Sequence, residues 1–277
     1  MSDESTEGGK VTEIVRAVGE LADKVPIYQD AIQPAAKEVG KGLQVVARAV
    51  NAALIPVEGL IWGVEQIRDF VRERVARKLE GVPPEDIQQP KPHIAVPAID
   101  ALRYTGSEHA LSELYANLLA TSMDKATAYR AHPGFVDMIK NMCPDEARIM
   151  RHLVAAPAYP LVNIKFVDKS NRSYVVTHRY LSLLGVDAGC EHVPLAPTYV
   201  DNLERLGLIR VDEMSKLHSE DAYKRIEEHP QVTRIVEDLN KTEGRRAEIQ
   251  RIRLLVTDLG KQFIRACVID KDAQPRS

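Results

Sequence analysis

The sequence has few of the residues that mark an exported, disulfide-stabilised protein. Its three cysteines, Cys143, Cys190 and Cys267, are odd in number, far apart and without a Cys-x-x-Cys pair. We therefore expect free thiols, as in a protein of the cytoplasm. The first ten residues are acidic and lack the positively charged start and apolar run of a signal peptide, so we expect a cytoplasmic location.

Long apolar runs are also missing. The most apolar stretch is Gly42 to Val64, and within it only the nine residues Ala49 to Val57 are nearly free of polar side chains. A spanning helix needs about 20 apolar residues, so this segment is too short to cross a bilayer. Gly59 and Gly63 still have the spacing that lets helices pack closely, with Trp62 beside them. A membrane-perturbing effector that uses residues 42–64 after activation therefore remains an alternative.

Charge of either sign is not in large excess, since 37 Lys and Arg face 40 Asp and Glu. A global basic field for nucleic acid is thereby excluded, and any such contact must be local. The best candidate is the stretch from Lys241 to Arg265, with seven basic against three acidic residues. The side chains predicted as nucleic-acid contacts in this alternative are Lys241, Arg245, Arg246, Arg251 and Arg253.

Catalytic and cofactor motifs are absent from the sequence. There is no His-Glu-x-x-His, Gly-x-Ser-x-Gly, phosphate-binding loop or Gly-x-Gly-x-x-Gly, and the eight histidines are scattered. We therefore expect neither an enzyme nor a bound cofactor or metal. His132 could serve as a base, but a histidine just before a helix-starting proline is more often a cap or a packed ring.

The first half of the chain has the pattern of helices. Residues 1–10 have almost nothing apolar to bury and are predicted to be disordered. Apolar residues then recur at helical spacing, and a run of prolines from Pro83 to Pro97 predicts an extended strap that is not helical. The predicted helices are Val11–Ala22, Ile27–Gly40, an amphipathic helix from Gly59 to Leu79, Glu108–Lys125 with Ser107 as its cap, Pro133–Met142 and Pro144–Val154.

After Pro160 the pattern changes to strands. Leu161–Val167 and Tyr174–His178 suit a hairpin, Thr198–Leu206 a helix, and Leu208–Val211 a further strand. A charged insert from Asp212 to Gln250 precedes a strand, Ile252–Val256, and a last helix, Leu259–Val268. This order predicts a mainly α protein, with an N-terminal helical domain at 11–141 followed by a winged-helix-like α+β module at 142–268. Residues 269–277 are expected to form a flexible tail.

In the predicted winged helix, Thr198–Leu206 takes the place of the recognition helix. Its Asp201 and Glu204 oppose Arg205, whereas a helix facing phosphates favours Lys or Arg. The charges therefore favour a module that recognises protein.

Several motifs, in order along the chain, resemble those of the abortive infection alpha family. They are Tyr28–Lys41, Gly59–Gly63, Tyr115–Ala120, His132–Phe135, Pro144–Ala147, Asn202–Ile209 and Thr257–Phe263. Cys143 stands where a serine cap is expected before Pro144, and a thiol accepts hydrogen bonds poorly. The resemblance covers roughly Val25 to Val268 and implies a role in abortive infection, in which an infected bacterium stops growing or dies before phage multiply.

The resemblance supplies no catalytic residues. We therefore expect the shared motifs to form a surface that binds a host or phage protein, with nucleic acid, membrane and a homo-oligomer as alternative partners. Around Tyr28–Lys41, helix capping and packing explain the polar residues as well as a binding pocket does. The motif residues predicted for this surface are Tyr28, Asp30, Gln33, Pro34, Lys37, Glu38, Trp62, Asn117, His132, Pro133, Asn202 and Arg205.

Overall fold

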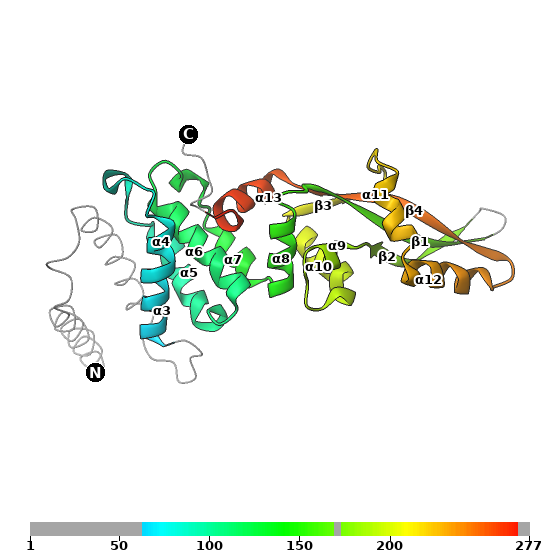
Figure 1. The fold of residues 1–277 in the computed structure, drawn as a ribbon, viewed down its shortest axis with the longest axis horizontal. Helices are drawn as coiled ribbons and strands as arrows, with labels where there is room; N and C mark the ends of the chain where they lie inside the picture. Colours follow the sequence, from blue (N-terminus) through cyan, green and yellow to red (C-terminus); the bar gives the residue numbers. More distant parts are fainter. Residues whose placement is uncertain (1–62, 169–172, 271–277) are drawn as a thin grey trace, which may run out of the picture.

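A computed structural model describes residues 63–168 and 173–270 of the chain. The helices between residues 64 and 152 gather at one end, and a sheet with short helices beside it projects away from them (Figure 1). The predicted amphipathic helix is present as α3 (Val64–Phe70), the π-helical turn η1 (Val71–Val75) and α4 (Ala76–Lys78). Ile67, Val71 and Val75 recur every four residues and are buried, which is why this side of the helix faces the core. The predicted helices at 11–22 and 27–40 lie outside the described residues.

Helix α6 (His109–Met123) is the centre of the helical body. Every residue from Leu111 to Met123 is buried, because the helix is surrounded by α5, α7, α8, η1 and the end of the chain. A helix without a solvent face can contain polar side chains only where each finds a partner. The helix begins one residue after Glu108, and the predicted cap Ser107 makes no capping bond to it.

The predicted proline strap is only partly correct. Residues 84–86 form a short 3-10 turn, η2 (Pro84–Asp86), but α5 (Pro92–Thr105) starts at the second half of the strap. Pro92 occupies the first turn of that helix, where an amide hydrogen is not needed. Pro97 lies inside the same helix, beyond its first turn, so the expectation that 92–97 is not helical was wrong.

Two short helices complete the body at the positions that prolines predict. The 3-10 turn η3 (Ala128–Arg130) leads to α7 (Gly134–Lys140), just after Pro133, and α8 (Pro144–His152) starts at Pro144. Proline favours the first helical positions because its backbone angle is already helical.

The second half of the chain is not a winged helix. It forms a four-stranded antiparallel sheet in the order β2-β1-β4-β3, and the two central strands are long: β1 is Ala158–Asp168 and β4 is Arg245–Val256. They pair over eleven positions, from Ala158 with Leu255 to Asp168 with Arg245. The predicted strand Ile252–Val256 is thus only the inner end of β4. The sequence prediction missed the rest because exposed Arg and Glu on its outer end obscure the alternation of a strand.

The other strands and the short helices attach to this central pair. On its outer sides lie β2 (Tyr174–Leu181) and β3 (Ile209–Asp212). Between β2 and β3 the chain forms α9 (Leu184–Asp187), the turn η4 (Val193–Leu195) and α10 (Ala196–Arg205). Helix α10 contacts α8, β2 and β3, so the predicted recognition helix packs as a structural element.

The charged insert folds on the sheet. It forms α11 (Asp221–Glu227) and α12 (Pro230–Asn240), which lie along β1 and β4 (Figure 1). A separate small core joins Val162 and Ile164 of β1 to Tyr223, Ile226 and Val232 of these helices. We call the outer sheet, residues 163–168, 174–179 and 245–250, together with α12, the sheet arm.

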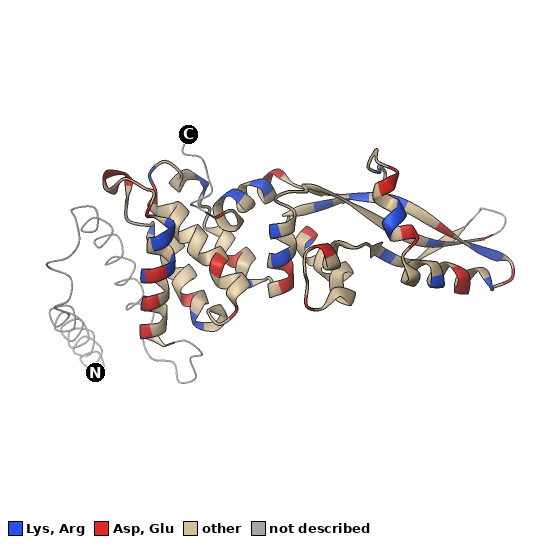
Figure 2. Ribbon diagram, in the orientation of Figure 1, with Lys and Arg blue, Asp and Glu red and all other residues tan. Residues whose placement is uncertain are grey.

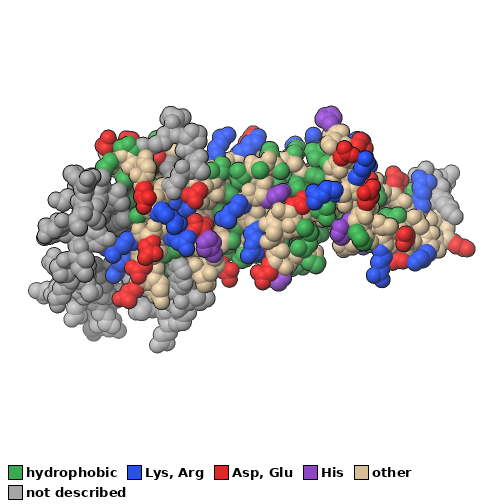
Figure 3. Space-filling view, viewed as in Figure 1, with side chains coloured by type: hydrophobic (Ala, Val, Ile, Leu, Met, Phe, Trp, Pro, Cys, Tyr) green, Lys and Arg blue, Asp and Glu red, His purple; other side chains and the backbone are tan. Residues whose placement is uncertain are grey.

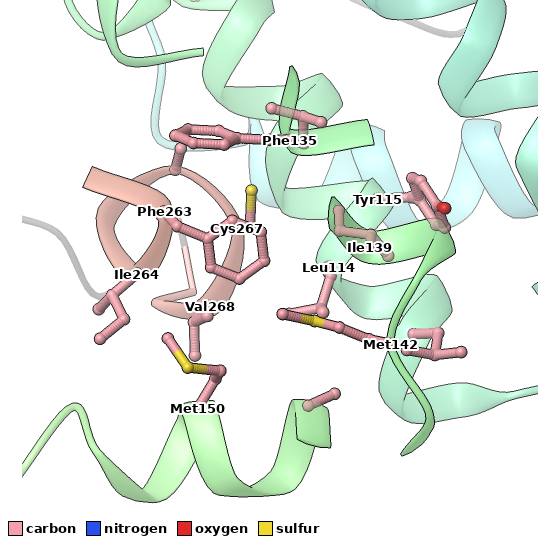
Figure 4. Packing of buried hydrophobic residues seen from close by; sticks show 14 of the residues in the cluster. Leu114, Tyr115, Phe135, Ile139, Met142, Met150, Phe263, Ile264, Cys267 and Val268 are labelled. Atoms are coloured by element: carbon pink, nitrogen blue, oxygen red, sulfur yellow. The ribbon is translucent and has the colours of Figure 1, made fainter. Parts of the chain in front are cut away.

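The end of the chain returns to the helical body. After β4, α13 (Asp258–Phe263) continues into a π-helical turn, η5 (Ile264–Val268), which packs against α6 and α8. Figure 4 shows Phe263, Cys267 and Val268 among side chains of α6, α7 and α8, with Phe263 edge-on to Phe135 at 5.3 Å. One continuous buried cluster therefore runs from Ile67 to Val268 and includes the inner end of the sheet.

Candidate functional site

The candidate site is the junction between the helical body and the sheet, where stretches that resemble the family motifs meet. At its centre is Asp145 in the first turn of α8, with an exposed fraction of 3%. Its carboxylate accepts hydrogen bonds from the backbone N–H of Glu191 at 2.8 Å and of His192 at 2.9 Å, and from the Tyr199 hydroxyl at 3.0 Å. Arg148 pairs with it one turn later. Asp145 thus ties α8 to the loop before α10.

These donors determine the charge of Asp145. Burial of the carboxyl group raises its pKa, but the two backbone N–H groups, Arg148 and Tyr199 together lower the pKa to about 2. Burial raises the pKa of the Tyr199 hydroxyl, and its bond to Asp145, which it can donate only while protonated, raises that pKa further. Asp145 is therefore an ionised structural anchor at neutral pH and a poor general acid or base.

The neighbouring Glu146 joins α8 to α10. Its Oε2 accepts the backbone N–H of Cys143 at 2.7 Å, and its Oε1 accepts Asn202 Nδ2 at 2.7 Å. Asn202 also donates to the carbonyl of Asn141 at 2.9 Å, and its own Oδ1 accepts two bonds from Arg205. Burial raises the pKa of Glu146 above its ordinary value, although its hydrogen bonds lower it. The motifs at 144–147 and 202–209 therefore meet directly.

The third contact joins residues 207–208, just before β3, to α13. Thr257 caps α13 by accepting the Gly260 N–H at 2.9 Å, while its hydroxyl donates to the carbonyl of Gly207 at 2.6 Å. Gly260 lies so close to the chain that a Cβ atom there would be 1.9 Å from the carbonyl oxygen of Leu208. Only glycine permits this approach. The motifs at 202–209 and 257–263 are thus packed backbone against backbone.

A fourth contact places α6 against the π-helical turn η5. Asn117 Nδ2 donates to the carbonyl of Cys267 at 3.0 Å, and the Thr121 hydroxyl donates to the carbonyl of Ala266 at 3.0 Å. In a π-helical turn the backbone hydrogen bonds join residues five apart and not four apart. Asn117 and Thr121, which are four residues apart and so lie on the same side of α6, donate to carbonyls of this turn. The motif that contains Asn117 therefore fixes the position of η5 against α6.

A family profile described as abortive infection alpha matches residues 63–267. The chain belongs to the abortive infection alpha family. The matched region contains the whole junction, whereas Tyr28–Lys41 lies before it. No curated protein matches the chain. A solved structure described as an uncharacterized protein from the hydrocarbon-degrading marine bacterium Alcanivorax borkumensis SK2 has 22% identity, covers 50% of this chain and 92% of its own, and has a TM-score of 0.34. That likeness is too low to support an argument.

The motif residues of this abortive infection alpha protein that the structure describes are Asn117, His132, Pro133, Asn202 and Arg205, and they do not share one surface. Asn117 is buried inside the body, with an exposed fraction of 3%, whereas His132 and Pro133 are exposed just before α7. His132 Nδ1 accepts the N–H of Gly134 at 3.1 Å, the cap that its position predicts. Asn202 and Arg205 lie together at the junction. Outside the described residues lie Tyr28, Asp30, Gln33, Pro34, Lys37, Glu38 and Trp62.

Most of the predicted nucleic-acid contacts already have partners within the abortive infection alpha chain. Arg251 binds Glu227 with two nitrogens, at 2.5 and 2.8 Å, and also pairs with Glu220. Arg253 pairs with Asp212 at 2.9 Å. Lys241 pairs with Asp238, Arg246 is 3.8 Å from Glu248, and Arg245 lies over the ring of Phe166. Figure 2 accordingly shows basic and acidic residues mixed along the arm.

The sequence prediction missed a second buried polar group in the body. Lys78, at 1% exposure, pairs with Glu113 of α6 at 2.9 Å and with Asp270 at 3.1 Å, and Arg74 reaches Glu113 at 2.7 Å. Glu113 precedes Asn117 by four residues and Thr121 by eight. Polar residues that recur every four positions on an otherwise apolar helix lie on one side of it. This spacing is the signal in the sequence that could have identified the side of α6 that faces η5.

Within 63–168 and 173–270, no three His, Cys, Asp or Glu side chains gather as metal ligands. A hollow of about 270 Å³ lies between α11 and β1, lined mainly by apolar residues such as Leu183 and Ile226. At its rim Arg225 and Tyr159 both bond Asp187, so these polar groups satisfy one another. In those same ranges, no helix combines the length and apolar character that crossing a bilayer requires.

Proposed function

We propose that this chain acts in abortive infection by binding a host or phage protein through its sheet arm, without catalysing a reaction of its own. Membership of the abortive infection alpha family supports the setting. In this proposal the motifs at the junction hold the arm in a fixed orientation on the helical body. A rigid support under an exposed recognition element lowers the entropic cost of binding.

The observation that supports the arm as the binding element is the exposure of apolar side chains at its edge. Tyr174 and Val175 of β2 are 59% and 56% exposed, although both are large and apolar. Aromatic residues on a projecting element are frequent anchors of protein interfaces. Figure 3 shows the arm as the narrow end of the molecule.

Plaque assays in a phage-infected bacterial host test this proposal. We expect the double variant Tyr174→Ser, Val175→Ser to fold normally and to lose protection against phage. Tyr129→Ser is the matched control, because Tyr129 is also an exposed tyrosine but lies on η3 of the helical body. Equal loss of protection in the control, or full protection by the double variant, would contradict a role for the arm.

A further inference from the structure

We propose that the free edge of β2 takes up an extended, acidic segment of the partner protein as a fifth strand of the sheet. This inference rests on the proposed function and names the partner's chemistry. β2 is at one end of the strand order, so among the described residues it pairs only with β1. Its other edge therefore presents unpaired backbone groups, the feature that strand addition uses.

The register shows which residues would pair with the added strand. The N–H of Asp168 donates to the carbonyl of Ser173 at 3.0 Å, so these two form a hydrogen-bonded pair at the end of the ladder. The next pairs are Val167 with Tyr174, Phe166 with Val175 and Lys165 with Val176. Because bonded and non-bonded pairs alternate in an antiparallel ladder, the backbone groups of Tyr174 and Val176 face away from β1. These are the groups available to a new strand.

The inner end of the same strand is closed to a partner. Two register shifts, one between Lys165 and Ile164 and one between Ile164 and Val162, each give β2 an extra residue, and Tyr180 adopts a positive φ of 56°. The Tyr180 N–H is bound to Oδ1 of the buried Asn163 at 3.0 Å, and α10 packs beside this part of β2. Bulges of this kind terminate pairing along an edge. The open segment is therefore short, from Tyr174 to Val176.

The charges around the open segment favour an acidic partner. Side chains alternate across a sheet, so Lys165, Tyr174, Val176 and Arg246 share the face opposite α12. Lys165 Nζ lies 4.4 Å above the Tyr174 ring, and Arg179, half exposed, follows at the inner end of β2. Glu248 lies 3.8 Å from Arg246, and Asp201 of α10 lies 3.9 Å from Arg179. Among the described residues, Lys165 therefore supplies the positive charge that no carboxylate pairs with. An extended segment with alternating acidic and apolar residues complements both the cations and the apolar side chains.

A proline substitution separates strand addition from other modes of binding. In Val176→Pro the lost N–H is one that faces away from β1, so the existing sheet keeps its hydrogen bonds while the edge loses a donor. Val176→Thr is the matched control, because threonine keeps the N–H and the β-branched shape. The probe is a fluorescent eight-residue peptide of alternating glutamate and valine, and its binding to the full chain is measured by anisotropy.

We expect the peptide to bind the wild type and Val176→Thr equally, and Val176→Pro about tenfold more weakly, as the loss of one main-chain bond implies. Unchanged binding to Val176→Pro, tighter binding of a lysine–valine peptide, or stronger binding of a single-stranded oligodeoxythymidine would each overturn the proposal. So would a dimer that forms through this edge in sedimentation. If the Tyr174, Val175 double variant loses phage protection while the peptide result is negative, the proposed function stands and only strand addition fails.

Discussion

Gly260 shows how one residue can fix the contact of two elements. Its missing side chain lets α13 lie directly on the carbonyl of Leu208. We predict that Gly260→Ala lowers the free energy of unfolding by about 2 kcal/mol, because the added carbon forces the backbones apart. Urea denaturation measures the change. Gly81→Ala is the control, since nothing lies within 4 Å of a Cβ at Gly81, and it should leave stability nearly unchanged.

Asp145 predicts how stability depends on pH. Its pKa in the folded chain is about 2, below that of an unfolded aspartate near 3.9, so its ionised form favours folding. This contribution, about 2 kcal/mol, is present above pH 4 and is lost as pH falls towards 2. We expect Asp145→Asn to be less stable than the wild type at pH 7 and closer to it at pH 2.5. A constant difference across that range, measured by denaturation, would show that Asp145 is not the titrating group.

At the scale of elements, the π-helical turn η5 depends on side chains of α6. We predict that Thr121→Val, which keeps the shape of the side chain, destabilises the chain by about 1 kcal/mol because the buried carbonyl of Ala266 loses its donor. Faster hydrogen exchange at 264–270 would locate the effect. Thr105→Val removes a hydroxyl that donates to the carbonyl of Ala101 in α5 and has no contact with η5, so it should leave exchange in that segment as it is.

The element predictions from sequence succeeded where the pattern was local. Pro144 and Pro133 predicted helix starts to within one residue, and the apolar face of 64–78 is the face that packs. The pairing of β1 with β4 could not be predicted in the same way. It joins Asp168 to Arg245 across 77 positions of sequence, and the outer half of β4 is charged because only its inner half enters the main core. The winged-helix prediction was wrong because it placed residues 245–250 in a charged insert and so missed the long pairing of β4 with β1.

In the candidate site, too, local features were predicted from the sequence and long-range contacts were not. The motifs at 144–147 and 202–209 were recognised, but their contact was not, because Glu146 and Asn202 are 56 residues apart and β1 and β2 lie between them in the sequence. Arg251 was predicted as a nucleic-acid contact from local charge alone. The structure gives it Glu227 as a partner, 24 residues away. Sequence counts of charge cannot reveal such pairs.

At the scale of the whole molecule, two cores predict two levels of stability. The main cluster joins the helices, the inner sheet and α13, whereas a small cluster holds α11 and α12 on the sheet. We predict that amides of α12 and the outer half of β4 exchange with solvent at a lower free energy than those of α6, because fewer apolar side chains must separate. Native-state hydrogen exchange measures both. Equal protection would mean that the arm and the body unfold as one unit.

The inner ends of the two central strands lie side by side, since the N–H of Val256 donates to the carbonyl of Pro157 at 2.9 Å. The segment between Pro157 and Val256, nearly one hundred residues long, thus leaves the helical body and returns to it at the same place. Lengthening or shortening the outermost turns changes how far this excursion extends, but it leaves the two attachment points where they are. Evolution can therefore retarget the tip of such a protein while its base stays the same.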